Sequence, residues 1–297
     1  MIVRSTIVVF VLITVSGAAV RLTGSGLGCE DWPTCNDERF VAELDDVHSM
    51  IEFGNRLISG LVLIPVVACV VAARRRDPRR RDLIRGAWGI LAVLAIEIPL
   101  GGITVLAGLT PAIVAAHFLV SMALIAMAVV LDDRAAQSDG PARDLVPPSV
   151  RTWSRAAVVT GAAVLVTGTV VTGAGPHSGD EEVGRLALDI TGVARVHSGT
   201  MWLLLALSTA AMWQAYRSGA PDSVRRRGGV LVAAIAAQGV IGYTQYAIGV
   251  PAGLVALHIF GATVVWIALL RFHLGLVTRG PEVVDGADAA SGAMAAP

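Results

Sequence analysis

Residues 108–117, GLTPAIVAAH, and residues 248–258, IGVPAGLVALH, begin two apolar segments in nearly the same way. Each stretch leads from a glycine turn through a proline into an apolar run that reaches a histidine, His117 or His258. The two histidines are 141 residues apart. This internal similarity predicts a duplicated chain with two related halves of four helices each, a parallel repeat of the kind found in other membrane folds.

Apolar segments recur along the whole chain, which has 297 residues and is 55% hydrophobic. A run of about 20 apolar residues is long enough to cross a bilayer, and we recognise eight such runs. They lie at about 3–21, 49–73, 86–106, 112–131, 156–174, 190–215, 229–248 and 253–275. We therefore predict an all-α integral membrane protein, with eight transmembrane helices that form two pseudo-symmetric four-helix bundles.

The duplication also predicts how the chain is divided. An N-terminal four-helix half should cover 1–134, a cytoplasmic linker 135–155 and a C-terminal four-helix half 156–278. The remaining residues, 279–297, are rich in Ala, Gly and acidic residues and are expected to form a disordered cytoplasmic tail. The first apolar run continues into a glycine-rich loop without a clear cleavage site, so we take it as the first span rather than a signal peptide.

The distribution of charge predicts the orientation in the membrane. All 23 basic residues are arginines, and 18 of them fall on one side of the predicted topology. Cytoplasmic loops carry an excess of basic residues, so this side, with both termini, is expected in the cytoplasm. The five remaining arginines are Arg21, Arg39, Arg56, Arg185 and Arg195. The formal net charge is zero, and no nucleic-acid partner is expected.

Three histidines lie a few residues inside the outer ends of predicted spans: His117, His197 and His258. A polar side chain is costly in hydrocarbon, so an intramembrane histidine indicates a functional site. Haem iron is commonly held by histidine, and helix bundles provide such sites. We predict that His197 and His258 bind one haem iron from opposite faces. The alternative is that each histidine only forms hydrogen bonds between helices.

The first half should contain a related but diverged pocket. Nearly the same offset, 142 residues instead of 141, relates Asn55 to His197, so this pocket combines His117 with an asparagine. Glu52 shares a helix face with Asn55, and His48 lies on the same face nearer the outer surface.

A carboxyl group at Glu52 would suit proton transfer. The alternative is an ion pair with Arg56 or Arg195 that only stabilises the bundle. Glu97, in the middle of span three, belongs either to a proton path or to an ion pair with an arginine across the bundle. His177 is expected to have a loop or propionate-contacting role, and His273 an interfacial one.

Cys29 and Cys35 lie in the first outer loop, within GCEDWPTC at 28–35. This loop faces an oxidising compartment, where a disulfide can persist. The pair is either a structural disulfide or redox-active, and spacing alone does not show that the thiols are within bonding distance. Cys69, in the second span, is expected to be a small apolar filler.

Several motifs together resemble the haem A synthase family of bacterial and mitochondrial membranes. They are RLTGSGLGCEDWPTC at 21–35, IEFGNR at 51–56, TGAGPHSGD at 172–180 and the histidines of spans four, six and eight. The resemblance covers all eight spans. Abundant Ala, Val and Arg and the absence of Lys indicate an actinobacterial-type member.

The resemblance implies an oxidoreductase that oxidises the C8 methyl of haem O to a formyl group, making haem A for cytochrome oxidase. It implies a haem b cofactor held by His197 and His258, with haem O as the substrate near His117 and Glu52 taking part in the oxidation. Cys29 and Cys35 match a cysteine pair found in many bacterial members. Membrane lipid, haem O synthase, an electron donor and a second copy of the chain are the partners it suggests.

One departure from the family concerns Asn55, because the family commonly has a histidine at this position. Either His117 alone holds the substrate haem, or His48 reaches inward from about 10 Å along the helix axis. We expect a single strong ligand with a weak or vacant opposite face. The haem propionates would meet Arg21, Arg56 or Arg195, since a guanidinium pairs well with a carboxylate.

Two other functions compete with this prediction. A cytochrome b-type electron-transfer subunit would keep its haem permanently and form no modified product. A haem carrier or transporter would move haem without changing its absorption spectrum. Neither accounts for Glu52 together with the other motifs.

Overall fold

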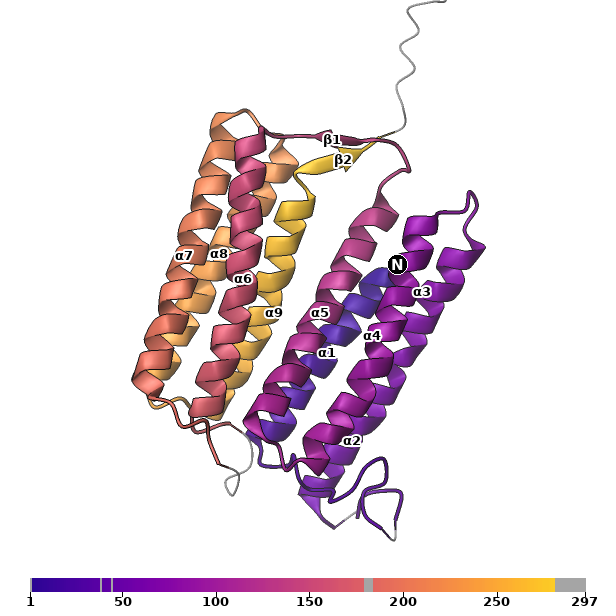
Figure 1. The fold of residues 1–297 in the computed structure, drawn as a ribbon, viewed down its shortest axis with the longest axis vertical. Coiled ribbons are helices and arrows are strands. Elements are labelled where there is room, and N and C mark those ends of the chain that lie inside the picture. The colour runs from indigo at the N-terminus through magenta and orange to yellow at the C-terminus, as the bar shows by residue number, and fades with distance from the viewer. Residues whose placement is uncertain (1, 38, 44, 179–183, 281–297) are drawn as a thin grey trace, which may run out of the picture.

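The computed structural model describes residues 2–37, 39–43, 45–178 and 184–280, and this part of the chain folds into two helical bundles that stand side by side (Figure 1). It contains eight segments that are long and apolar enough to cross a membrane, which confirms the predicted fold class. The protein is thus a multi-pass membrane protein. The first bundle comprises α1 (Ile2–Leu22), α2 (Val47–Leu61), α3 (Leu63–Arg75), α4 (Arg81–Leu106) and α5 (Pro111–Ala136). The second comprises α6 (Pro148–Ala174), α7 (Ile190–Arg217), α8 (Asp222–Ala247) and α9 (Ala252–Leu274).

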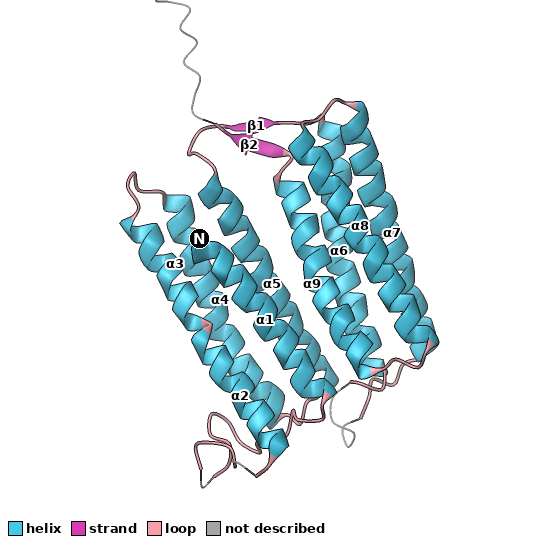
Figure 2. Ribbon diagram, turned by 180° about the vertical axis from the view of Figure 1, so that it is seen from behind, coloured by secondary structure: helices cyan, strands magenta, loops and turns pink. Residues whose placement is uncertain are grey.

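The second membrane segment is two helices rather than the one continuous helix that its apolar pattern predicts. It is interrupted at Val62, between α2 and α3 (Figure 2). Pro65, in the first turn of α3, has no N–H to donate to the carbonyl of Leu61. Several helices also extend beyond the predicted spans; α6 begins at Pro148 instead of 156, because polar first turns remain helical outside the apolar run.

A short two-stranded sheet closes one end of the molecule. Strand β1 (Ala142–Asp144) pairs antiparallel with β2 (Val277–Arg279), with Ala142 opposite Arg279. The predicted linker therefore contains a strand. Arg279, the first residue of the predicted tail, belongs to the other strand, and residues 281–297 of that tail lie outside the described residues. We call this the sheet end; the opposite end, which carries Cys29 and Cys35, is the disulfide end.

The two bundles share one apolar core. Helices α1, α5, α6 and α9 make the contacts between the bundles. At their centre, the indole N–H of Trp266 in α9 donates to the backbone oxygen of Met122 in α5 across 3.0 Å, in a buried position. Buried side chains from both bundles form a continuous cluster, so the halves are packed together rather than hinged.

The duplication is visible in the backbone before α5 and α9. Gly108 and Leu109 have φ values of 60° and 57°, and Gly249 and Val250 have values of 85° and 57°. A left-handed conformation is uncommon for residues other than glycine. Its recurrence at corresponding positions of the two halves shows that both use the same turn to start the helix that carries the histidine.

Candidate functional site

His197 in α7 and His258 in α9 face each other within the second bundle. Their ring centroids are 6.4 Å apart, with an angle of 71° between the ring planes. A metal–imidazole bond is about 2 Å long, so one ion held between two rings separates their centroids by roughly 6 Å. The separation of the two rings therefore matches that of two imidazoles that hold one metal ion.

Residues of α6 and α8 support both rings. The Thr167 hydroxyl is hydrogen-bonded to Nδ1 of His197 at 3.1 Å, a contact of the kind that fixes the ring orientation of a metal-binding histidine. A Cβ atom at Gly168 would lie 3.1 Å from Cε1 of His197, and one at Gly242 would lie 3.0 Å from Cε1 of His258. Glycine at these positions lets the supporting helices pack directly against the imidazoles.

In the first bundle, neighbouring helices make comparable contacts with Asn55 and with His117. Ser16 in α1 donates to Oδ1 of Asn55 at 2.8 Å, and the neighbouring Gly17 faces the Asn55 amide. A Cβ atom at Gly101 would lie 3.1 Å from Cε1 of His117.

Thus Ser16 and Gly17 contact the side chain of Asn55 in the way that Thr167 and Gly168 contact the ring of His197. Each side chain is contacted by a hydroxyl residue of the first helix of its own bundle.

Glu52 is buried where α2 meets the disulfide loop, residues 29–35. Its Oε2 accepts the backbone N–H of Cys29 at 2.9 Å, and its Oε1 forms an ion pair with Arg56, one turn further along α2. Arg56 also donates to the carbonyl oxygens of Asp31 and Thr34, at 2.7 and 2.8 Å. The predicted ion pair is therefore formed with Arg56, and it also fixes the loop.

The disulfide loop covers the disulfide end of the first bundle. Cys29 and Cys35 are bonded to each other and are both buried, while Cys69 is a buried free thiol. Trp32, between the bonded cysteines, lies against Gly102 of α4, which leaves no space for a side chain there. Gly102 is next to Gly101, which contacts His117. The disulfide loop therefore contacts both Glu52 and the part of α4 that lies beside His117. Sequence reasoning missed this role of Trp32.

Glu97 has a partner that the sequence did not indicate. Its Oε1 lies 3.3 Å from Nδ1 of His117 and also accepts the hydroxyl of Ser121. The Glu97 side chain is 8% exposed and that of His117 is 37% exposed. The predicted arginine partner across the bundle is replaced by the histidine. The sequence contained one weak signal for this contact. Glu97 and Gly101 are four residues apart and share one face of their helix, and His117 and Ser121 share one face of the next helix in the same way.

The other predicted polar residues lie at the periphery of these clusters. His48, exposed in the first turn of α2, is hydrogen-bonded through Nδ1 to the Ser25 hydroxyl at 2.9 Å. His177 is bonded to the carbonyl oxygen of Val250 at 2.9 Å, which is a loop contact.

Two further residues lie away from the pockets. His273 is bonded to the Ser154 hydroxyl at 3.0 Å, near the sheet end. Arg195 is exposed on α7.

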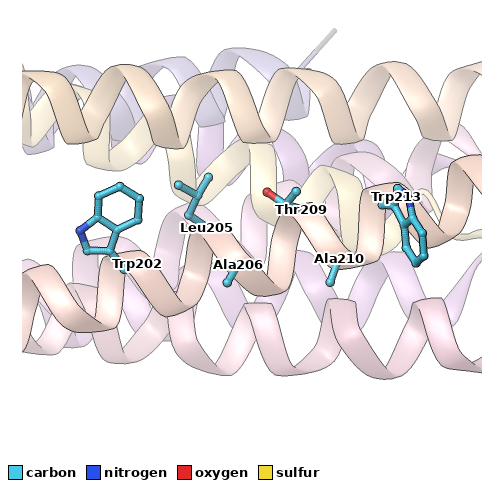
Figure 3. Close-up of a pocket in the computed structure, with 6 residues that line it drawn as sticks. All are labelled: Trp202, Leu205, Ala206, Thr209, Ala210 and Trp213. Atoms are coloured by element: carbon cyan, nitrogen blue, oxygen red, sulfur yellow. The ribbon is translucent and has the colours of Figure 1, made fainter.

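A separate groove runs along α7 towards the sheet end (Figure 3). Its volume is about 500 Å³. The lining residues are Trp202, Leu205, Ala206, Thr209, Ala210 and Trp213. None of the predicted site residues lines this groove, so the candidate chemistry belongs to the two histidine clusters.

Fold and site together define a multi-pass membrane protein with two histidine clusters, one with two neighbouring histidines and one with a single histidine beside the buried Glu97. The chain belongs to the COX15-CtaA family of cytochrome oxidase assembly proteins, whose family model matches residues 1–177. This confirms the family predicted from the motifs.

Individual relatives match part of the chain. It is 35% identical to the heme A synthase of Lysinibacillus sphaericus over 121 residues, which are 40% of this chain and 38% of that protein. It is 30% identical to the heme A synthase of Bacillus licheniformis over 127 residues, 42% of this chain and 41% of that protein. It is 40% identical to a protoheme IX farnesyltransferase of Thermus thermophilus over 101 residues, 34% of this chain and 16% of that protein. The chain thus spans less than half the length of each of these relatives.

Proposed function

We propose that this protein is a haem A synthase, a membrane oxidoreductase that oxidises the C8 methyl of haem O to a formyl group. The observation that carries the proposal is the asymmetry of the two pockets, since one has two facing histidines and the other has one histidine, an asparagine and nearby acids. The similarity to heme A synthases supports the same conclusion. We assign the substrate to the N-terminal half, residues 1–134, and the cofactor to the C-terminal half, residues 156–278.

The second bundle is suited to a resident haem b held by His197 and His258. With both axial positions filled, such a haem supplies electron transfer and has no open site for substrate. Thr167 orients the His197 ring through its hydroxyl. Gly168 and Gly242 keep the supporting helices close, so the two imidazoles are held in place before a cofactor binds.

The first bundle is suited to haem O as a substrate ligated by His117. Oδ1 of Asn55 accepts the hydroxyl of Ser16, so only the amide N–H groups of Asn55 remain for other contacts. These groups are hydrogen-bond donors and do not ligate a metal. His48 is bonded to Ser25 in the loop that follows α1. These contacts favour a single histidine ligand with an open opposite face.

Glu52 is the residue that we assign to the oxidation itself. Converting a methyl to a formyl group is a four-electron oxidation that adds one oxygen atom. Two hydroxylations with dioxygen as the oxidant, each using two electrons from a donor and releasing one water, followed by loss of a further water, balance the reaction. Protons move at each stage, so a proton-transferring group must be near. Arg56 and the Cys29 N–H fix the carboxyl group in a buried position on the helix that also carries Asn55. A fixed carboxyl of this kind serves as a general base or as an electrostatic stabiliser.

Arg21 is the best candidate for a propionate partner. Its Nε is buried and has no hydrogen-bond partner within the described residues. The same holds for Nε of Arg56, but the other two guanidinium nitrogens of Arg56 are engaged by Glu52 and the disulfide loop. A guanidinium with an unpaired buried N–H favours a carboxylate ligand. Arg195 is exposed on α7 and would serve the haem of the second bundle.

The same proposal includes the cellular setting. The arginine-rich sheet end would face the cytoplasm of a bacterial plasma membrane, which leaves the disulfide outside. The similarity to part of a protoheme IX farnesyltransferase supports a partner enzyme that supplies the farnesylated haem. An electron donor is required to complete the turnover.

The test is a haem analysis of the full chain, purified from cells that also make haem O. We expect the pyridine haemochrome spectrum and chromatography of extracted haems to show haem b together with haem A or a hydroxylated haem O. Membranes from cells without the chain are the control. Haem b alone, with haem O unchanged, would overturn the proposal in favour of an electron-transfer cytochrome.

Changing Asn55 to His should alter the ligation of the substrate haem. The position corresponds to His197, and Gly17 leaves space beside it, so a histidine there should become a second axial ligand. We expect the five-coordinate, high-spin fraction of bound haem to become low-spin, as measured by electron paramagnetic resonance. An Asn55→Gln variant is the control and should remain high-spin. A high-spin Asn55→His protein would contradict the predicted position of the iron.

A further inference from the structure

Glu97 is an acidic residue in the membrane-spanning part of α4 whose nearest titratable neighbour is a candidate haem ligand. Its Oε1 lies 3.3 Å from Nδ1 of His117, within ion-pair distance. The contact does not have the geometry of a hydrogen bond, and Nδ1 of His117 has no hydrogen-bond partner among the described residues. Glu97 is therefore the acceptor placed beside this edge of the ring.

Other contacts hold the carboxyl group in this place. The Ser121 hydroxyl, one turn after His117 in α5, donates to the same Oε1. Gly101, one turn after Glu97, packs against the imidazole and leaves no space for a larger side chain between α4 and the ring. The carboxyl and the imidazole are thus fixed on facing helices, with 8% of the acid and 37% of the histidine side chain exposed.

The second bundle lacks this acid. The position 141 residues after Glu97 is Gln238, and its amide donates to the backbone oxygen of His258 at 2.7 Å instead of contacting the ring. Nδ1 of His258 is buried and has no hydrogen-bond partner among the described residues. Neither Nδ1 is hydrogen-bonded among the described residues, but only that of His117 has a carboxyl group within ion-pair distance, so the two histidine clusters differ in this respect as well as in the number of histidines.

We propose that Glu97 is a positioning residue that places the proton of His117 on Nδ1, so that Nε2 is directed at the iron of the substrate haem as a strong donor. The inference rests on the proposed function, because it takes His117 as the axial ligand. A carboxyl group behind a ligating histidine fixes the tautomer and raises the basicity of the ligand. A more basic axial ligand stabilises the oxidised iron, so Glu97 sets the N-terminal haem at a lower reduction potential than a neutral partner would.

The test compares the full-length protein with Glu97→Gln, after iron protoporphyrin IX has been added as the probe. We expect the variant to bind the probe, with a lower iron–histidine stretching frequency in the ferrous resonance Raman spectrum. We also expect a higher reduction potential for the N-terminal haem by spectroelectrochemistry. A His117→Ala protein identifies which signals belong to this pocket, and Glu97→Asp should restore part of both shifts.

Gln238→Leu is the matched control in the other bundle and should leave the signals of the N-terminal haem unchanged. A low-spin spectrum from the second bundle reports that each variant is folded. Unchanged stretching frequency and potential in a folded Glu97→Gln protein would overturn the inference while leaving the proposed function intact. Failure of the unmodified protein to bind a probe through His117 would overturn both.

Discussion

Replacing His258 with alanine is expected to abolish haem b binding by the second bundle. The rings of His197 and His258 are 6.4 Å apart, so both are needed to hold an iron between them, and one imidazole cannot maintain a six-coordinate haem. We expect the low-spin absorption of the purified protein to disappear and the extracted haem b to fall close to zero. The measurement is a reduced-minus-oxidised spectrum with quantification of the extracted haem.

His273→Ala is the matched control for this experiment. His273 lies on the same helix but is bonded to Ser154 near the sheet end, so its loss should leave the low-spin spectrum unchanged. A His258→Ala protein that keeps a full low-spin haem would show that the two facing histidines only connect helices. In that case the second bundle would not be a cofactor site.

Replacing Glu52 with glutamine is expected to lower haem A formation by about a hundredfold or more, the range typical for loss of a general acid or base. Glutamine keeps an oxygen that can accept the Cys29 N–H, so the loop contact survives while the charge is lost. The measurement is the ratio of haem A to haem O in membranes of cells that supply haem O.

Two further results make the Glu52 experiment decisive. Haem b content should stay unchanged, which reports an intact second bundle. Glu43→Gln removes an exposed acid from the same region, where it pairs with Arg39, and should leave the haem ratio unchanged. Haem A output equal to that of the unmodified protein would remove Glu52 from the oxidation.

The spans and the histidines could be predicted because they depend on local composition. An apolar run of about 20 residues is sufficient to indicate a crossing, and a histidine within it indicates a site. The sheet between β1 and β2 could not be predicted in this way, because each strand has three residues and is defined only by a partner far away in sequence. The extensions of the helices beyond the predicted spans were missed because their terminal turns are polar and do not belong to an apolar run.

The partners within the site depend on packing and were less predictable. The pairing of Glu52 with Arg56 follows from their spacing on one helix, and it was considered from the sequence. The contact between Glu97 and His117 depends on which faces α4 and α5 turn towards each other, and no local pattern fixes that. The position of Trp32 over Gly102 likewise depends on how the loop folds back over the bundle.

The packing of α5 against α9 has a consequence for how the two halves would cooperate. These helices carry His117 and His258, and they belong to one buried core that is continuous across both bundles. The separation between the two pockets is thus set when the chain folds, and no domain swings between them. A redox centre in one half and a substrate in the other would therefore keep a fixed separation across this shared core.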